Sequence, residues 1–397
     1  YAFQILAARW LGAAGFGVVS NLFSWVLTIS GVLSLGIATT LVRYISHHEA
    51  QGQSMKPVIR NGVMAESISV LGFLFLCGLF RKPFTRSLFD GNTFLFLIMI
   101  GGVLGYGALT FLQGILRGLR QFLYSATSIT TLAVARLSLS AVLIVSLGYG
   151  ATGAAWAILL SPLPVLALAL YWCHQGTQYD KASGSDPMPL HSFLAFALPA
   201  TIISGIDAFL PRSGTILINL LAVEKADELV GLFTAAALLA RLPELFVESI
   251  SAPLLSNVSR ADAMNNRPLV RQYTTRMTQA MVALALAYML GISILGPRLV
   301  PLIYGKEFWF PRFDIFLLSV GTGFYILAKL YSQTAMVKKG AGYVAMIWAI
   351  ATIALIAFSI GAPLPLLRRV EVSYIVANGF VAAVLAYQSY MAVYSNR

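Results

Sequence analysis

The stretch Thr93–Ile115 reads TFLFLIMIGGVLGYGALTFLQGI and contains no charged side chain. A helix needs about 20 mostly apolar residues to cross the hydrocarbon core of a bilayer. The stretch is therefore long and apolar enough to span a membrane as a single helix. Runs of this kind recur along the whole chain, so little sequence remains for a large water-soluble domain.

The composition agrees with a membrane protein. Of the 397 residues, 58% are hydrophobic and 11% charged, and the mean hydropathy is +0.80. In a soluble domain of ordinary composition, about a quarter of the residues are charged. We therefore expect an all-α, polytopic, multi-pass protein.

Basic residues exceed acidic ones, which gives a net charge of +12. In a soluble protein this balance would suggest nucleic acid as a partner, but here the basic residues gather in short loops, as membrane insertion favours. We expect membrane lipids and no nucleic acid as partners. Cys77 and Cys173 lie in or beside apolar runs without metal-ligand spacing, so neither a metal, a disulfide nor a cofactor is expected.

The apolar runs predict eleven spans that follow a short apolar stub, Tyr1–Ala8. Because the sequence starts inside this stub without a Met, we expect a truncated first helix, which makes about twelve helices in all. The spans are Gly17–Val42, Asn61–Phe80, Thr93–Ile115, Phe122–Leu147, Gly153–Cys173, His191–Leu221, Leu229–Val258, Arg276–Leu295, Phe313–Ala335, Gly342–Ile360 and Val372–Tyr394.

The polar stretch His174–Leu190 divides the spans into six and six. We expect an N-terminal six-helix bundle over residues 1–175, a cytoplasmic linker over 176–190 and a C-terminal six-helix bundle over 191–397. The halves resemble each other weakly: Gly17 aligns with Gly231, and Gln113 aligns with Gln333 after one insertion. Paired bundles of this kind are typical of transporters, with the substrate between the repeats. The basic loop between Arg43 and Arg60 is placed on the cytoplasmic side, which puts both termini there and the protein in the cytoplasmic membrane.

Several motifs then occur in order. They are Ala8–Gly17 (ARWLGAAGFG), Ser34–Tyr44 (SLGIATTLVRY), Leu112–Gly118 (LQGILRG) and the region of Pro253. In these motifs the chain resembles the polysaccharide flippases (Wzx-type O-antigen and exopolysaccharide exporters) of the multidrug/oligosaccharidyl-lipid/polysaccharide (MOP) exporter superfamily. The resemblance implies a MOP/MATE-like fold, alternating access, and export of sugar chains carried on polyprenyl pyrophosphate for polysaccharide and lipopolysaccharide biosynthesis. It also implies polysaccharide polymerase and chain-length machinery as partners.

An ionisable side chain deep in the membrane usually faces a cavity or a partner. Arg136 lies well inside its span, with Ser125 and Ser140 on the same helical face. We predict that it binds the cargo pyrophosphate; the alternative is that it holds neighbouring helices together. Arg212 and Lys329 are further candidates for substrate binding.

Arg241, Glu244 and Glu248 form an i, i+3, i+7 stripe that includes Pro243. The stripe is either a self-neutralised ion pair or a site for H⁺ or Na⁺. We assign Arg241 to substrate binding and Glu244 and Glu248 to ion coupling. Asp207 and Arg212 lie on either side of Pro211. Asp207 is the third coupling candidate, since broken helices often line transport sites.

Two alternatives remain within the superfamily: a MATE-like drug/cation antiporter and a lipid II flippase. A membrane glycosyltransferase or polymerase would need long outer loops or a catalytic domain, and the sequence has neither. It also lacks a P-loop and a Gly-x-Ser-x-Gly motif. We therefore expect a transporter and not an enzyme.

Overall fold

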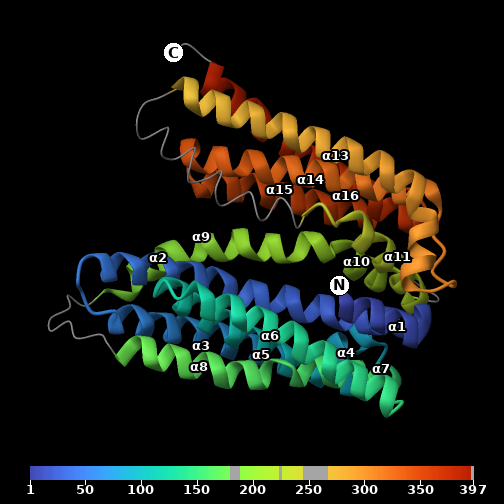
Figure 1. Cartoon of the computed structure of the whole chain (residues 1–397), viewed down its shortest axis with the longest axis horizontal. Helices are drawn as coiled ribbons and strands as arrows, with labels where there is room; N and C mark the ends of the chain where they lie inside the picture. Colours follow the sequence, from blue (N-terminus) through green and yellow to red (C-terminus); the bar gives the residue numbers. More distant parts are fainter. Residues whose placement is uncertain (179–187, 223–225, 245–266, 395–397) are drawn as a thin grey trace. The chain divides into compact units, whose positions relative to one another are not determined.

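The computed structural model describes residues 1–178, 188–222, 226–244 and 267–394, and every regular element within them is helical (Figure 1). Ten of these helices are long and apolar enough to cross a membrane. The predicted all-α, polytopic fold is thus confirmed.

The chain forms two compact units, Tyr1–Leu220 and Leu221–Arg397. The first consists of α1 (Ala2–Ser30), the π-helical segment η1 (Gly31–Leu35), α2 (Gly36–Ala50), α3 (Lys56–Leu79), α4 (Arg81–Phe89), α5 (Thr93–Gly118), α6 (Phe122–Ser140), the π-helical segment η2 (Ala141–Ser146), α7 (Gly150–Leu160), α8 (Pro162–Gln178), α9 (Leu190–Phe209), the 3₁₀ turn η3 (Leu210–Arg212) and α10 (Ser213–Leu221). The second consists of α11 (Ala226–Ala240), α13 (Arg267–Tyr304), α14 (Arg312–Lys339), α15 (Ala341–Gly361) and α16 (Leu366–Tyr394).

The division between the units lies later than the boundary expected from the polar linker. Helix α9 packs against α2 and η1 in the first unit, where Gly36 lies directly against the main chain of Thr201. The Asn61 side chain of α3 also donates a hydrogen bond to the carbonyl of Met188, 2.8 Å away. The linker residues 179–187 lie outside the described part of the chain. A single C-terminal bundle over 191–397 stays a prediction.

Two features account for ten spans where twelve were expected. The stub and the span Gly17–Val42 belong to one helical run, Ala2–Glu49, which Gly12 interrupts with a positive φ of 70°. The predicted span Leu229–Val258 is described only as far as Glu244, and its helix α11 ends at Ala240.

Helix α5 is central to the first unit and packs against α1, α2, α7 and α8. Its glycines permit this close approach. Gly101 faces the side chain of Leu159 on α7, and a Cβ at Gly105 would lie 3.3 Å from Pro162 on α8. On the other side, a Cβ at Gly114 would lie 2.7 Å from the Ala38 Cα of α2. Small residues therefore allow the helices to pack closely, as in other membrane bundles.

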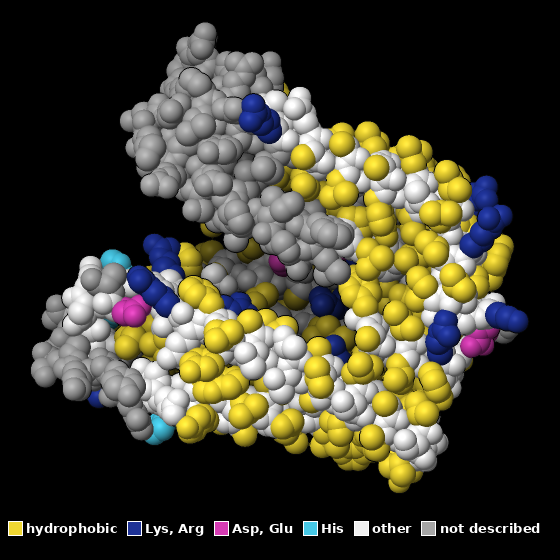
Figure 2. Space-filling model, in the orientation of Figure 1, with side chains coloured by type: hydrophobic (Ala, Val, Ile, Leu, Met, Phe, Trp, Pro, Cys, Tyr) yellow, Lys and Arg dark blue, Asp and Glu magenta, His cyan; other side chains and the backbone are white. Residues whose placement is uncertain are grey.

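Large apolar side chains cover much of the visible described surface, where charged ones are sparse (Figure 2). On α3, Leu71, Phe75 and Leu79 are exposed at four-residue spacing and form one apolar stripe. A stripe of this size is costly in water and favourable against lipid. The surface thus supports the assignment to a multi-pass membrane protein.

Candidate functional site

Arg136 lies in the last part of α6 but deep within the span Phe122–Ser146, ten residues before its end, which corresponds to about 15 Å of helix. Its guanidinium stands over the rings of Phe23 at 4.6 Å and Phe3 at 5.1 Å. Its Nη1 donates a hydrogen bond to the Tyr106 hydroxyl of α5 at 3.1 Å. Helices α1, α5 and α6 therefore meet at the Arg136 guanidinium.

The guanidinium retains unused donor capacity. The Arg136 Nε is buried and has no acceptor among the described residues, and the described ion pairs do not include Arg136. Aromatic faces stabilise a cation by about 0.5–2 kcal/mol without neutralising it. Arg136 is therefore a membrane-embedded positive charge whose described neighbours leave it able to attract an anion.

The two serines predicted to accompany Arg136 have other contacts. The Ser140 hydroxyl donates to the main-chain carbonyl of Arg136 at 2.7 Å, not to an anion site. Ser125 accepts a hydrogen bond from the Arg117 Nε at 3.0 Å, and Arg117 also donates to Gln113 at 3.1 Å. The structure thus associates Ser125 with a second half-buried arginine, Arg117, which was not among the candidates from the sequence.

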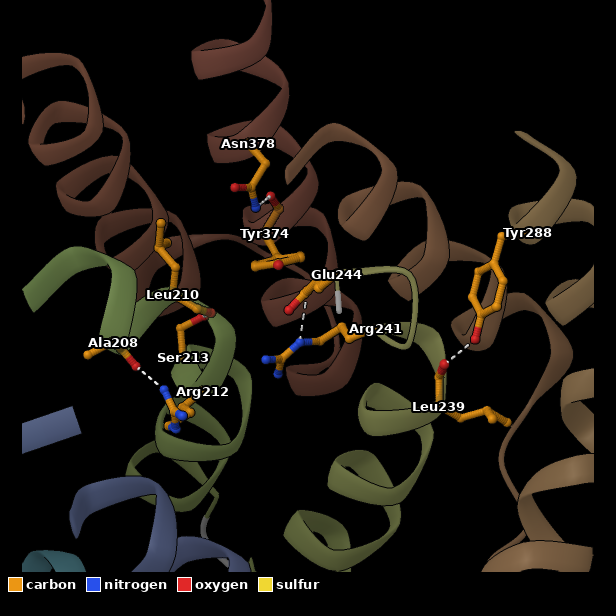
Figure 3. Close-up of polar contacts among 10 residues, drawn as sticks. All are labelled: Ala208, Leu210, Arg212, Ser213, Leu239, Arg241, Glu244, Tyr288, Tyr374 and Asn378. Carbon is orange, nitrogen blue, oxygen red and sulfur yellow. Dashed lines mark hydrogen bonds and ion pairs between the residues drawn. The ribbon is translucent and has the colours of Figure 1, made fainter. Parts of the chain in front are cut away.

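In the second unit, Arg241 and Glu244 form a half-buried ion pair with 3.0 Å between Nε and Oε1 (Figure 3). Glu248 lies outside the described residues. Tyr374 of α16 lies near the pair, and its neighbour Asn378 donates to the Tyr374 carbonyl at 2.7 Å. Tyr288 of α13 donates to the carbonyl of Leu239 at the end of α11. The ion pair therefore lies where α11 ends beside α16.

Breaking this ion pair should destabilise the protein. We expect Glu244→Gln to lower the unfolding free energy by about 3 kcal/mol, because the half-buried Arg241 loses the charged carboxylate of the described ion pair. The double variant Arg241→Met, Glu244→Met should recover most of this loss. Thermal unfolding of the purified protein in detergent measures both effects. Equal stability of wild type and Glu244→Gln would contradict the assigned pairing.

The predicted break at Pro211 is present as the single 3₁₀ turn η3 between α9 and α10. Arg212 turns back, and its Nη1 donates to the Ala208 carbonyl at 2.6 Å (Figure 3). Asp207 is half-buried one turn before the break. In the second unit, the Lys329 ammonium stands 5.7 Å from the ring centre of Tyr325. The roles predicted for Asp207, Arg212 and Lys329 stay predictions.

Glu66 lies in the predicted span Asn61–Phe80, and no role was predicted for it from the sequence. In the structure it lies inside α3, ten residues from the first residue, Lys56. Its Oε1 accepts a short hydrogen bond of 2.6 Å from Ser34 in the π-helical segment η1. Its Oε2 is buried and has no partner among the described residues. The signal in the sequence was weak, because Glu66 is only five residues from the start of the predicted span Asn61–Phe80, whereas α3 begins five residues earlier, at Lys56.

Comparison with known proteins adds to this picture. No curated protein sequence matches the chain. Among solved structures, a multidrug resistance MATE family transporter of the MOP superfamily in the inward-facing conformation is similar, with a TM-score of 0.76 and 16% identity. That match covers 99% of this chain and 94% of the other.

A second similar structure is a MOP superfamily transporter from Pyrococcus furiosus Vc1, described as having reverse polarity of its binding pocket. Its TM-score is 0.70 at 17% identity, with 98% of this chain and 91% of the other covered. At such low identity these likenesses define the fold. They confirm the predicted MOP/MATE-like architecture.

The family model described as polysaccharide biosynthesis protein matches residues 1–259. The match covers more than half of the chain and includes α1 to α11, with Arg136, Glu66 and the break at Pro211. Its agreement with the helical transporter fold shows that this chain belongs to the polysaccharide biosynthesis protein family of the MOP superfamily.

Proposed function

We propose that the protein is a flippase that moves oligosaccharide linked to polyprenyl pyrophosphate across the cytoplasmic membrane. The single observation that carries the proposal is the family match over residues 1–259 in a chain with a transporter fold. The cargo has a large polar head, a pyrophosphate and a long apolar tail. Polysaccharide biosynthesis needs such a step, because sugar chains assembled on the inner side must reach the outer one.

Arg136 supports this assignment. The pyrophosphate is negatively charged, so a cation within the membrane would stabilise it on its path across. An arginine presents a planar set of donors that can bind phosphate oxygens in pairs, and the Arg136 fork retains donors. Arg241 is a weaker candidate because Glu244 already neutralises it. Within the proposal, Arg212 and Lys329 assist in cargo binding, while Asp207, Glu244 and Glu248 couple transport to H⁺ or Na⁺.

A MATE-like drug/cation antiporter is the second candidate, favoured by the multidrug resistance transporter among the similar structures. A cationic drug would be repelled by the unneutralised charge of Arg136, which argues for an anionic cargo. A lipid II flippase shares the pyrophosphate and differs in its glycan.

Complementation separates these functions. The full chain is expressed in a strain that lacks its own O-antigen flippase, and surface glycan is measured per amount of membrane protein. We expect surface glycan to be restored and drug resistance to be unchanged. Increased drug resistance without surface glycan would instead establish the antiporter. Rescue only of a strain that lacks its lipid II flippase would establish the third function.

A further inference from the structure

Two carboxyl groups, neither of them assigned a role above, meet between α14 and α16 in the second unit. Asp314 lies in the first turn of α14 and is 6% exposed, and Glu371 lies in the second turn of α16 and is 1% exposed. The side chains are within hydrogen-bonding reach of each other. Helices α14 and α16 pack along their length, so the pair is enclosed within the bundle.

The hydrogen bonding at this pair is incomplete as long as both groups are ionised. The Asp314 Oδ1 and both Glu371 oxygens are buried and receive no hydrogen bond from any described residue. An ionised carboxylate can only accept hydrogen bonds. The contact between Asp314 and Glu371 therefore becomes a hydrogen bond only if one of the carboxyl groups carries a proton.

Two charged groups face the Glu371 carboxyl in the described part of the chain, Asp314 and Arg368. Arg368 is 53% exposed and approaches Asp314 with 3.7 Å between Nε and Oδ1. Arg369 instead donates to the Ile360 carbonyl at 3.0 Å. Helix α15, which also packs against α16, contains no charged residue. One exposed arginine thus balances one carboxylate, and the second carboxyl group needs a cation.

A proton fits this space better than a metal ion. Ca²⁺ and Mg²⁺ take six or more oxygen ligands, whereas the pair offers at most four, one of which faces Arg368. On α16, the Ser373 hydroxyl lies 2.7 Å from the Ser359 hydroxyl and also donates to the Val370 carbonyl, so its described contacts are to groups other than the carboxyl pair. A proton needs only two oxygens, one on each carboxyl group.

We propose that Asp314 and Glu371 form a proton-binding site, in which one shared proton joins α14 to α16. When the proton leaves, two like charges remain in a poorly hydrated space and repel each other. The first turn of α14 and the second turn of α16 then separate, or water enters between them. By the loop polarity proposed above, this end of the unit faces the outer side. The site would thus respond to the outer pH.

The proton itself can be observed without any transport. Infrared spectra of the purified full chain in detergent, recorded over a pH series, report the carbonyl stretch of protonated carboxyl groups. We expect the wild type to show a band that disappears on alkalinisation. This band should be missing from Glu371→Gln in the difference between the two spectra, where the carboxyl groups common to both proteins cancel. The glutamine amide can still donate to Asp314, so this variant should fold. Glu307→Gln, at an exposed glutamate between α13 and α14, should keep the band.

Two results would overturn the site. One is a band that persists unchanged in both Glu371→Gln and Asp314→Asn. The other is loss of the band when NaCl replaces choline chloride at constant pH, which would show that Na⁺ occupies the pair. The contribution to transport rests on the proposed function and is tested separately. Glycan export by Glu371→Gln should lose its dependence on outer pH, and an unchanged pH profile beside a confirmed band would exclude coupling.

Discussion

Replacing Gly114 by leucine should prevent the first unit from folding. A Cβ at this position would lie 2.7 Å from the Cα of Ala38, 2.8 Å from its Cβ and 2.9 Å from its carbonyl oxygen. Two of these atoms are main chain and cannot rotate away, so α2 and α5 would have to separate. Overpacking in a well-packed core costs about 1–3 kcal/mol, and a whole leucine between two helix backbones should exceed this range.

The matched control is Gly72→Leu. Gly72 lies inside α3, is exposed, and a Cβ there would meet no atom within 4 Å. Leucine is a better helix former than glycine by up to about 1 kcal/mol, so this variant should fold at least as well as the wild type. The amount of monodisperse protein after detergent extraction measures both variants. A wild-type yield from Gly114→Leu would show that α2 and α5 do not pack as described.

Arg136→Ala should insert and fold but lose glycan export. A hydrogen bond to a charged group contributes about 1.5–3 kcal/mol, which corresponds to at least a tenfold loss of cargo binding. Arg136→Lys should recover part of the export, because the charge survives while the planar fork does not. The measurement is surface glycan in a strain that lacks its own flippase, normalised to membrane protein.

A purely structural Arg136 would behave differently. Its removal would release Tyr106 and the rings of Phe3 and Phe23, so the yield of Arg136→Ala would fall. The protein that does fold would then export glycan normally. Arg136→Met keeps much of the apolar stem and separates the two roles: it should fold like the wild type and still lose export. Full export from Arg136→Met at equal protein level would refute cargo binding.

The helices could be predicted from the sequence because apolar length alone specifies a membrane span. The predicted ends of the helices were less accurate, and two acidic residues, Asp314 and Glu371, therefore lay at or beside the ends of predicted spans. The last span was predicted to begin at Val372, but α16 begins at Leu366, so Glu371 lies inside the helix and is buried. Asp314 was the second residue of its predicted span and therefore seemed to lie at the surface. An error of a few residues thus concealed a pair of carboxyl groups.

Contacts between distant segments could not be predicted for a related reason. The sequence showed Arg136, Ser125 and Ser140 on one helical face, which is correct for an isolated helix. The partners Tyr106 and Arg117 both come from α5, and only tertiary packing decides which of them each polar group meets. The same holds for Glu66, whose contact Ser34 is 32 residues away. Periodicity reports the face of a helix and not the neighbour on that face.

The π-helical segment η1 indicates that the helical run Ala2–Glu49 holds one residue more than an uninterrupted α-helix would need there. Such a segment arises when one additional residue is accommodated in an α-helix without disturbing its flanks. The residues before and after η1 point to the same side of the helix, so Val26 and Ala38 both face glycines of α5. Relatives one residue shorter at this point would align with a single gap inside a transmembrane helix, where gaps are usually treated as errors. Ser34, which donates to Glu66, lies inside this segment, so the contact depends on the local π-helical geometry.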